Sequence, residues 1–136
     1  MKSITTEKAP KALGPYSQAI VSDNFCFVSM QLGLNPKTGK IISDDVDKQT
    51  EKAIKNIEAI LMEAGFELSD VVKSTLYITD LSDFQSVNEV YAKYFTHKPA
   101  RSLVVQFAMP ASAKVALDVI AYKQEESAEN LEYVTR

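Results

Sequence analysis

One arginine stands where a loop leads into an apolar strand, and its side chain is well suited to bind a small anion. Arg101 follows Pro99 and Ala100 and precedes the apolar segment 102–107, so its stem is expected to be held while its guanidinium stays at the rim. A guanidinium can donate two parallel hydrogen bonds to a carboxylate, which fixes the orientation of a ligand as well as its affinity. Taken alone, an arginine in this place is more often part of a surface or interface ion pair, and that alternative stays open.

The chain offers little else of the usual catalytic or metal-binding chemistry. Its only histidine, His97, lies in a short loop before Arg101, and we interpret it as a surface histidine without a catalytic role. Its only cysteine, Cys26, lies in the apolar run 25–28 and is expected to be a buried structural thiol. No cluster of His, Cys, Asp and Glu has the spacing of metal ligands, so neither a zinc site nor a Cys-His nucleophile pair is predicted.

Two amphipathic helices are predicted from apolar side chains spaced three and four residues apart. The first is marked by Val46, Thr50, Ala53, Ile54, Ile57, Leu61 and Ala64. The second is marked by Phe84, Val87, Tyr91 and Phe95. The Ser-Asp-Asp segment 43–45 can cap the first helix, and Gly65 suits a left-handed end. Ser82 or Asp83 is expected to cap the second.

Strands are predicted where β-branched and aromatic residues gather, at 16–21, 24–32, 71–79, 102–107 and 114–122. A turn is predicted between the second strand and the first helix, where Pro36 sets φ and Gly39 supplies a positive φ. The order of elements predicts an α+β sandwich, a β-sheet with both helices on one face. We expect one domain over residues 1–122 and a polar tail over residues 123–136.

Composition and charge narrow the possible partners. Fifteen basic and 18 acidic side chains give a formal net charge of -3, and the lysines of the first helix alternate with acids, so nucleic acid is an unlikely partner. No apolar run is long enough to cross a membrane and the first ten residues lack a signal-peptide core, so the cytosol is the expected compartment. Val104, Gln106 and their neighbours leave apolar residues on the sheet face away from the helices, and a second subunit is the expected cover.

Four segments of the chain together resemble one known family. They are Leu-Gly-Pro-Tyr-Ser-Gln-Ala at 13–19, Asn-Pro-Lys-Thr-Gly at 35–39, Asn-Glu-Val-Tyr at 88–91, and Pro-Ala-Arg-Ser at 99–102 followed by Met-Pro at 109–110. In this order and spacing they resemble the RidA (YjgF) superfamily, also labelled endoribonuclease L-PSP. The resemblance covers about residues 3–122, nearly the whole expected domain.

The resemblance implies a chorismate-mutase-like α+β fold and a homotrimer with three clefts at the subunit interfaces. It also implies hydrolysis of 2-iminobutanoate and 2-iminopropanoate to 2-oxo acids and ammonia, which limits metabolite damage and uses no cofactor. The expected ligand of the clefts is therefore a small imino or oxo acid.

Carried over by position, the resemblance assigns four site residues. Arg101 takes the place of the carboxylate-binding arginine and Tyr16 that of the cleft tyrosine, and these two are the expected catalytic residues. Asn88 matches the family's helix asparagine and Ser29 its substrate-lining serine. A tyrosine in the core, an asparagine that supports the loop before Arg101, and a serine that satisfies a neighbouring polar group are the alternatives.

Three positions of the expected substrate site depart from the catalytic members that this chain resembles. Met30 stands where those members usually have glycine, Leu103 where they have cysteine, and Ala116 where they have an acidic residue that helps to activate the attacking water. A missing general acid or base typically removes about 10² to 10⁴-fold in rate. Asp118 lies two residues beyond Ala116 on the same strand face, and could act through a bridging water.

Three functions are therefore compared. The first is imine hydrolysis, with Arg101 binding the carboxylate and Tyr16 and strand backbone groups holding the imine and a water. The second is a trimer that binds small carboxylates without turnover, which the departures at Met30, Leu103 and Ala116 keep open. The third is a translation-inhibiting endoribonuclease, against which the net negative charge and the missing histidine pair count.

Overall fold

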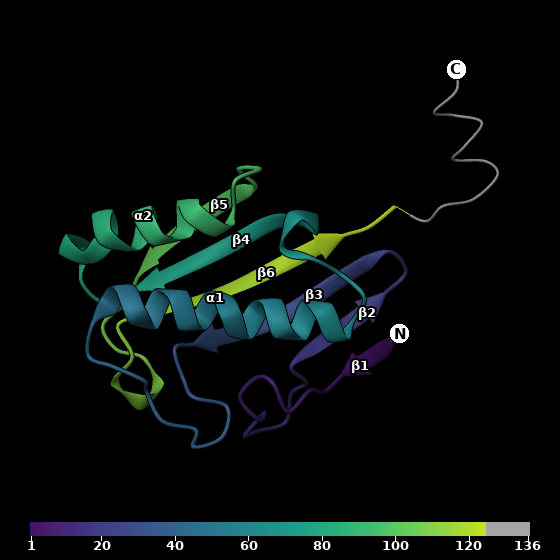
Figure 1. Ribbon diagram of the computed structural model, residues 1–136, viewed down its shortest axis with the longest axis horizontal. Coiled ribbons are helices and arrows are strands. Elements are labelled where there is room, and N and C mark those ends of the chain that lie inside the picture. The colour runs from purple at the N-terminus through teal and green to yellow at the C-terminus, as the bar shows by residue number, and fades with distance from the viewer. Residues whose placement is uncertain (125–136) are drawn as a thin grey trace.

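Six strands and two helices make up the regular structure of residues 1–124, the residues that the computed structural model describes (Figure 1). The elements in chain order are β1 Lys2–Ile4, β2 Ala19–Ser22, β3 Phe25–Leu32, α1 Val46–Glu63, β4 Val71–Ile78, α2 Phe84–Tyr94, β5 Ala100–Val105 and β6 Val115–Tyr122. Short 3-10 turns, Leu68–Asp70, Leu81–Asp83 and Pro110–Ser112, precede β4, α2 and β6. Of the tail expected at 123–136, residues 125–136 lie outside the described residues.

All six strands form one mixed sheet in the order β1-β2-β3-β6-β4-β5. Strands β4 and β5 are parallel because α2 carries the chain back between them, and the other neighbouring pairs are antiparallel. Figure 1 shows α1 and α2 lying over the same face of this sheet. The predicted α+β sandwich with both helices on one face is therefore confirmed.

Helix α1 begins and ends where the sequence predicts. Asp45 is its N-cap, and the Asp45 carboxylate accepts a hydrogen bond from the Asp47 amide at 2.8 Å. At the other end Gly65 has a φ of 85°, and the chain reverses so that the Phe66 amide donates to the Leu61 carbonyl at 2.8 Å. Both ends are thus fixed by local chemistry.

The start of α2 differs from the prediction. Asp83 occupies the N-cap position, but its side chain makes no capping hydrogen bond. The cap is Asp80, whose carboxylate accepts from the amide of Ser82 at 2.9 Å and from its hydroxyl at 2.8 Å; these bonds lower the pKa of Asp80. Because a 3-10 turn leads directly into the helix, the capping residue lies one turn earlier than Ser82 or Asp83.

Strand boundaries also shift at three places. Strand β1 was not predicted, because three residues are too short to show an alternating pattern. Strand β2 begins at Ala19, so Tyr16 lies in a loop and not on the strand predicted at 16–21. Strand β5 spans Ala100–Val105 in place of 102–107, because its parallel pairing with β4 already begins between Ala100 and Lys73.

The two faces of the sheet are covered differently. Between the sheet and the helices lies the main core, which includes the fully buried Ile54, Ile57, Leu76 and Leu117. On the opposite face, Phe25, Phe27, Val104 and Tyr122 are 40%, 43%, 38% and 38% exposed. Within residues 1–124 these side chains stay partly exposed, so the apolar character predicted for this face is confirmed.

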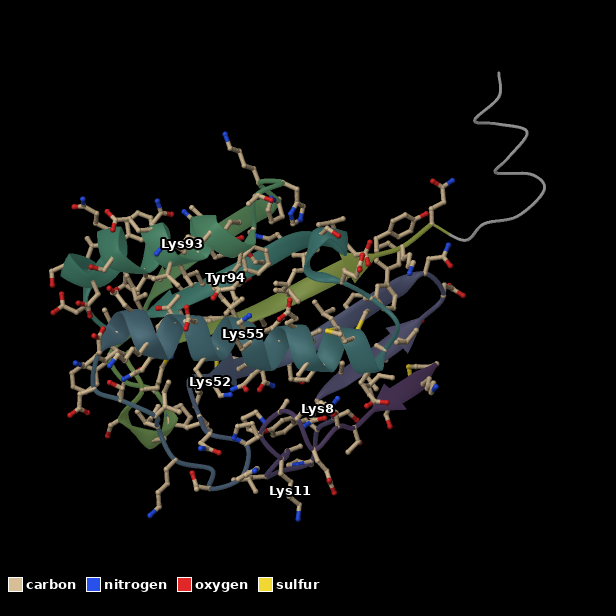
Figure 2. All side chains as sticks on the ribbon, viewed as in Figure 1. Lys8, Lys11, Lys52, Lys55, Lys93 and Tyr94 are labelled. Carbon is tan, nitrogen blue, oxygen red and sulfur yellow. The ribbon has the colours of Figure 1, made fainter. Side chains whose placement is uncertain are left out.

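Lysine side chains gather on the outer surface of the helix layer. Figure 2 shows them on α2, on α1 and in the N-terminal loop: Lys93, Lys55, Lys52, Lys8 and Lys11, with Tyr94 among them. Two acids interrupt this set, because Glu58 pairs with Lys55 at 3.6 Å and Glu51 accepts from the Tyr94 hydroxyl at 2.9 Å. The predicted alternation of charges on the first helix is confirmed, as expected for a solvated helix face.

Candidate ligand-binding site

The guanidinium of Arg101 lies against one face of α2. Its Nη1 donates to the Asn88 side-chain oxygen at 2.7 Å, and its central carbon lies 4.8 Å from the Tyr91 ring centre and 5.6 Å from that of Phe84. Phe84, Asn88 and Tyr91 are spaced four and three residues apart, so they share one helix face. We call Arg101 with these three residues the arginine half of the site.

Buried contacts fix the aromatic side of the arginine half. The Tyr91 hydroxyl and the Ser74 hydroxyl lie 2.6 Å apart, and Ser74 is the β4 residue that pairs with Arg101. Tyr91 also stacks on Phe95, with the ring centres 4.4 Å apart. Burial raises the pKa of Tyr91, so its hydroxyl stays neutral and the ring offers Arg101 a π face without a second charge.

No carboxylate neutralises Arg101 within residues 1–124, where the one ion pair joins Lys55 to Glu58. The guanidinium is partly buried and is held by an amide oxygen and two aromatic rings. Neutral partners leave its positive charge available to a ligand carboxylate. The alternative of a surface ion pair is therefore wrong for the described residues, whereas the alternative of an interface ion pair stays open. Asn88 holds the guanidinium itself, and not the loop before it.

A β-bulge in β3 presents the second set of expected site residues. Val28 pairs with Val119 and Gln31 with Leu117, so two residues of β3, Ser29 and Met30, stand opposite Asp118 alone. A bulge of this kind redirects side chains and is common beside binding sites. The Ser29 hydroxyl donates to the Ser17 carbonyl at 2.6 Å and thereby ties the bulge to the loop that carries Tyr16.

Tyr16 and Met30 line a shallow pocket beside this bulge. The pocket has a volume of about 420 Å³, and its other lining residues include Gln18, Leu34 and Pro110. Tyr16 is 55% exposed, so the alternative of a core tyrosine is wrong. We call Tyr16, Ser29 and Met30 the bulge half of the site.

The structure does not bring the two halves together within one chain. The bulge half lies on β3 and the loop before β2, the arginine half on β5 and α2, and strands β6 and β4 separate β3 from β5. Adjacent strands are about 4.8 Å apart, so the three steps from β3 to β5 amount to roughly 14 Å. One small ligand cannot contact both halves of the same chain.

The remaining two site residues are less accessible. Leu103 is partly buried, lies two residues after Arg101 on the same strand face, and packs against the main core. Ala116 is 0% exposed and packs in a small apolar cluster with Leu32, Met109 and Ala113.

The histidine and the cysteine have the predicted surroundings. His97 is exposed, and its Nε2 lies 2.8 Å from the Val71 carbonyl oxygen, so it ties the loop before β5 to the start of β4. Cys26 is 0% exposed, and burial raises the pKa of its thiol to about 11. Within residues 1–124, no group of three His, Cys, Asp or Glu residues is arranged to hold a metal ion.

Sequence reasoning missed three buried amide side chains that hold the bulge half. Gln18 donates to the Pro10 carbonyl at 2.8 Å and accepts from the Thr6 amide at 2.7 Å, and Asn56 donates to the carbonyls at both ends of segment 32–34 at 3.0 Å. Gln49 accepts from the Lys114 amide. Gln49 and Asn56 lie seven residues apart on the apolar stripe of α1, a signal that was visible in the sequence.

It also missed a short hydrogen bond on the open sheet face. The Tyr77 hydroxyl of β4 donates to Asp118 Oδ2 of β6 at 2.6 Å. This bond, together with desolvation and the nearby negative charge, raises the pKa of Tyr77 to about 12. The period-two spacing of β6 predicted Asp118 on the same face as Ala116. Its hydrogen-bond partner, Tyr77, lies 41 residues earlier in the chain, so local spacing could not predict the contact.

Comparison with known proteins places the chain in a family. A family model described as endoribonuclease L-PSP matches residues 6–123. The chain is 51% identical over 119 residues to Reactive Intermediate Deaminase A, chloroplastic, of Arabidopsis thaliana, covering 87% of this chain and 64% of that protein. It is 39% identical over 119 residues to human 2-iminobutanoate/2-iminopropanoate deaminase, covering 87% of each.

Solved structures agree with the sequence relatives. The YjgF gene product of E. coli superposes with a TM-score of 0.87 at 38% identity, covering 91% of this chain and 100% of that one. E. coli TdcF with bound serine gives a TM-score of 0.87 at 37% identity over the same shares. Fold and site thus define a YjgF-like α+β protein whose Arg101 has no carboxylate partner within residues 1–124. The chain belongs to the endoribonuclease L-PSP family, the RidA (YjgF) superfamily that the four motifs indicated.

One further structural finding concerns membranes. No helix among residues 1–124 combines the length and the apolar character that spanning a bilayer requires.

Proposed function

We propose that this protein is a cytosolic 2-imino acid deaminase, which hydrolyses small imines such as 2-iminobutanoate and 2-iminopropanoate to 2-oxo acids and ammonia. The observation that carries the proposal is the guanidinium of Arg101, fixed by neutral partners and without a carboxylate of its own in the described chain. The names of the Arabidopsis and human relatives support it, because both are deaminases. The serine bound to TdcF supports the ligand class, because serine carries a carboxylate.

The chemistry asks little of a protein beyond binding and orientation. Arg101 would hold the carboxylate of the imino acid by two parallel hydrogen bonds, which fixes the adjacent imine carbon. Tyr16 would supply an aromatic wall and a hydroxyl at the other side of the ligand. Small imines already react with water, so orientation and exclusion of bulk solvent are enough to accelerate their hydrolysis.

The proposal includes a homotrimer, because one chain cannot complete the site. An imino acid of four carbons is shorter than the roughly 14 Å between β3 and β5. In a closed ring of identical subunits, the arginine half of one copy meets the bulge half of the next. The exposed Phe25, Phe27, Val104 and Tyr122 support this arrangement, since an assembly would cover the apolar face on which they lie.

An imine-trapping assay tests the proposal. An amino-acid oxidase or a dehydratase generates the imine, and semicarbazide captures whatever the protein has not hydrolysed. We expect wild-type protein to reduce the trapped product, Arg101→Ala to leave it unchanged, and Arg101→Lys to act weakly because a point charge lacks the two-pronged geometry. Sedimentation of each variant reports whether the assembly is intact.

The binding-only alternative gives a different outcome in the same assay. Wild-type protein would then leave the trapped product unchanged while calorimetry still detects binding of 2-oxobutanoate. That pair of results would overturn the deaminase assignment and keep Arg101 as the carboxylate anchor.

A further inference from the structure

Strand β6 carries the one acidic residue of the six-stranded sheet. None of the other strands contains an aspartate or glutamate. Asp118 is partly buried on the face away from the helices, and its Oδ2 accepts the 2.6 Å hydrogen bond from Tyr77. Its Oδ1 has no hydrogen-bond partner among the described residues, so one carboxylate oxygen is available.

The bulge places Asp118 next to the bulge half of the site. Ser29 and Met30 of β3 stand directly opposite Asp118, and Met30 lines the same pocket as Tyr16. Thr75 of β4 and Ser102 of β5 continue the same row across the sheet. Asp118 thus lies one strand away from the residues expected to hold the imine, in a row of small polar side chains.

Ala116 cannot supply this chemistry. Its methyl group is 0% exposed among Leu32, Met109 and Ala113, so the position offers no carboxylate to a water. Tyr77 is the strand partner of Ala116, yet its hydroxyl reaches Asp118 two residues further along β6. The Tyr77 side chain therefore starts opposite Ala116, which has no acid, and ends at the carboxylate of Asp118.

We infer that Asp118 is the proton acceptor for the attacking water, oriented by the hydrogen bond from Tyr77, an inference that rests on the proposed deaminase function. The Asp118 carboxylate is the group that touches the water. Tyr77 is a positioning residue, because it holds Oδ2 and leaves Oδ1 without a hydrogen-bond partner among the described residues.

The proton steps balance without a cofactor. The water oxygen bonds to the carbon of the iminium group, the C=N π electrons move to nitrogen, and one water proton passes to Asp118. Protonated Asp118 then returns that proton to the amino nitrogen of the carbinolamine. The C–N bond breaks as the C=O bond forms, and ammonia leaves with the hydroxyl proton as ammonium, so the carboxylate is regenerated.

Steady-state kinetics of substituted proteins test this inference. Asp118→Asn keeps the size of the side chain and removes its basicity, so kcat should fall about 10² to 10⁴-fold while binding of 2-oxobutanoate stays at the wild-type level. Asp118→Glu should restore turnover to within about tenfold of wild type, since it returns a carboxylate. Tyr77→Phe should lower kcat by about tenfold through the loss of one orienting hydrogen bond.

Two controls separate this inference from the proposed function. Asp23→Asn makes the same change at an exposed turn between β2 and β3 and should leave kcat unchanged. If wild type hydrolyses imines, Arg101→Ala is inactive and Asp118→Asn turns over at the wild-type rate, the inference fails and the deaminase assignment stands. If wild type does not hydrolyse imines, the deaminase assignment fails, and the inference about Asp118 fails with it.

A structural role for Asp118 would give another pattern. Asp118→Asn would then lose affinity for 2-oxobutanoate and melt at a lower temperature along with its loss of kcat, and Asp118→Glu would restore none of them. That result would also overturn the inference, whereas a fall confined to kcat and reversed by glutamate supports it.

Discussion

The two halves of the site are held in place by different means. In the arginine half, side chains hold a side chain: Asn88, Tyr91 and Phe84 of α2 position one guanidinium. In the bulge half, buried amides hold the backbone, because Gln18 and Asn56 hydrogen-bond to main-chain groups of neighbouring loops. The proposed anchor for the ligand carboxylate is thus positioned by one helix, while the proposed opposite wall depends on the course of the main chain.

The largest expected effect concerns whether the two halves of a cleft come from different copies. Arg101→Ala and Tyr16→Ala should each lower the rate of imine hydrolysis. For Arg101→Ala the rate should fall on the order of 10²-fold, because the ligand carboxylate loses its charged partner. When the two variants are denatured, mixed in equal amounts and refolded, about one cleft in four combines an unsubstituted Arg101 from one copy with an unsubstituted Tyr16 from the next, so about a quarter of wild-type activity should return.

Refolding each variant by itself provides the control for that mixture. If the mixture stays as inactive as the two single variants although mixed trimers have formed, the two halves of a cleft come from the same copy. The proposal that neighbouring copies share a cleft is then wrong.

The next effect tests the backbone-held half through stability. Gly33 follows β3, and a Cβ added there would lie 2.6 Å from the Gln49 carbonyl oxygen and 2.7 Å from its Cα. These are backbone atoms of α1 and cannot turn away, so Gly33→Ala should cost about 1–3 kcal/mol in the free energy of unfolding, measured in urea.

Gly14→Ala is the matched control in the same half. A Cβ at Gly14 meets only the Tyr16 ring at 3.3 Å, and that exposed side chain can move. If Gly33→Ala loses no more unfolding free energy than Gly14→Ala, the end of β3 does not lie as close to the α1 backbone as the structure indicates.

A smaller effect tests the arginine half through ligand affinity. Asn88→Ala removes one hydrogen bond to the guanidinium and should weaken 2-oxobutanoate binding by about two- to tenfold in calorimetry. Asn88→Asp should weaken it more, because a carboxylate 2.7 Å from the guanidinium competes with the ligand. Gln85→Asp adds the same charge at an exposed position of α2 and serves as control. Unchanged binding in Asn88→Asp would show that the ligand docks elsewhere.

The smallest effect concerns alkaline pH and the Tyr77–Asp118 hydrogen bond. The pKa of Tyr77 is raised from 10.0 to about 12 in the folded protein. Because the folded state holds this proton more tightly than the unfolded state, the contribution to stability is complete below about pH 10 and is lost as the pH rises towards 12. Tyr77→Phe should therefore show a shallower loss of unfolding free energy than wild type over this range. Equal slopes for the two proteins would contradict the raised pKa.

The sequence allowed prediction of the elements whose signals are local. Periodicity and capping residues placed α1 and Gly65 correctly, and β-branched runs located five of the six strands to within a few residues. Arg101 could be recognised because a loop, a proline and an apolar strand meet there in consecutive residues. The cap of α2 was placed one turn too late, since a 3-10 turn before a helix has no pattern of its own.

The rest of the site depends on pairings between distant segments. The bulge at Ser29 and Met30 exists only because β6, far along the chain, supplies one residue against two. The contact between Asn88 and Arg101 depends on how α2 lies over the β4–β5 pair, which no local spacing records. Gln49 and Asn56 could have been noticed as polar residues on an apolar helix stripe, but the carbonyl groups they satisfy lie on other elements.

The buried thiol of Cys26 has a consequence for a protein that handles electrophiles. The thiolate is the reactive form of cysteine, and burial keeps the Cys26 thiol protonated. Here the one cysteine of the chain is buried in the main core, and its thiol has a pKa of about 11. On the proposed function, Cys26 is therefore neither a nucleophile towards the imine nor a target for it.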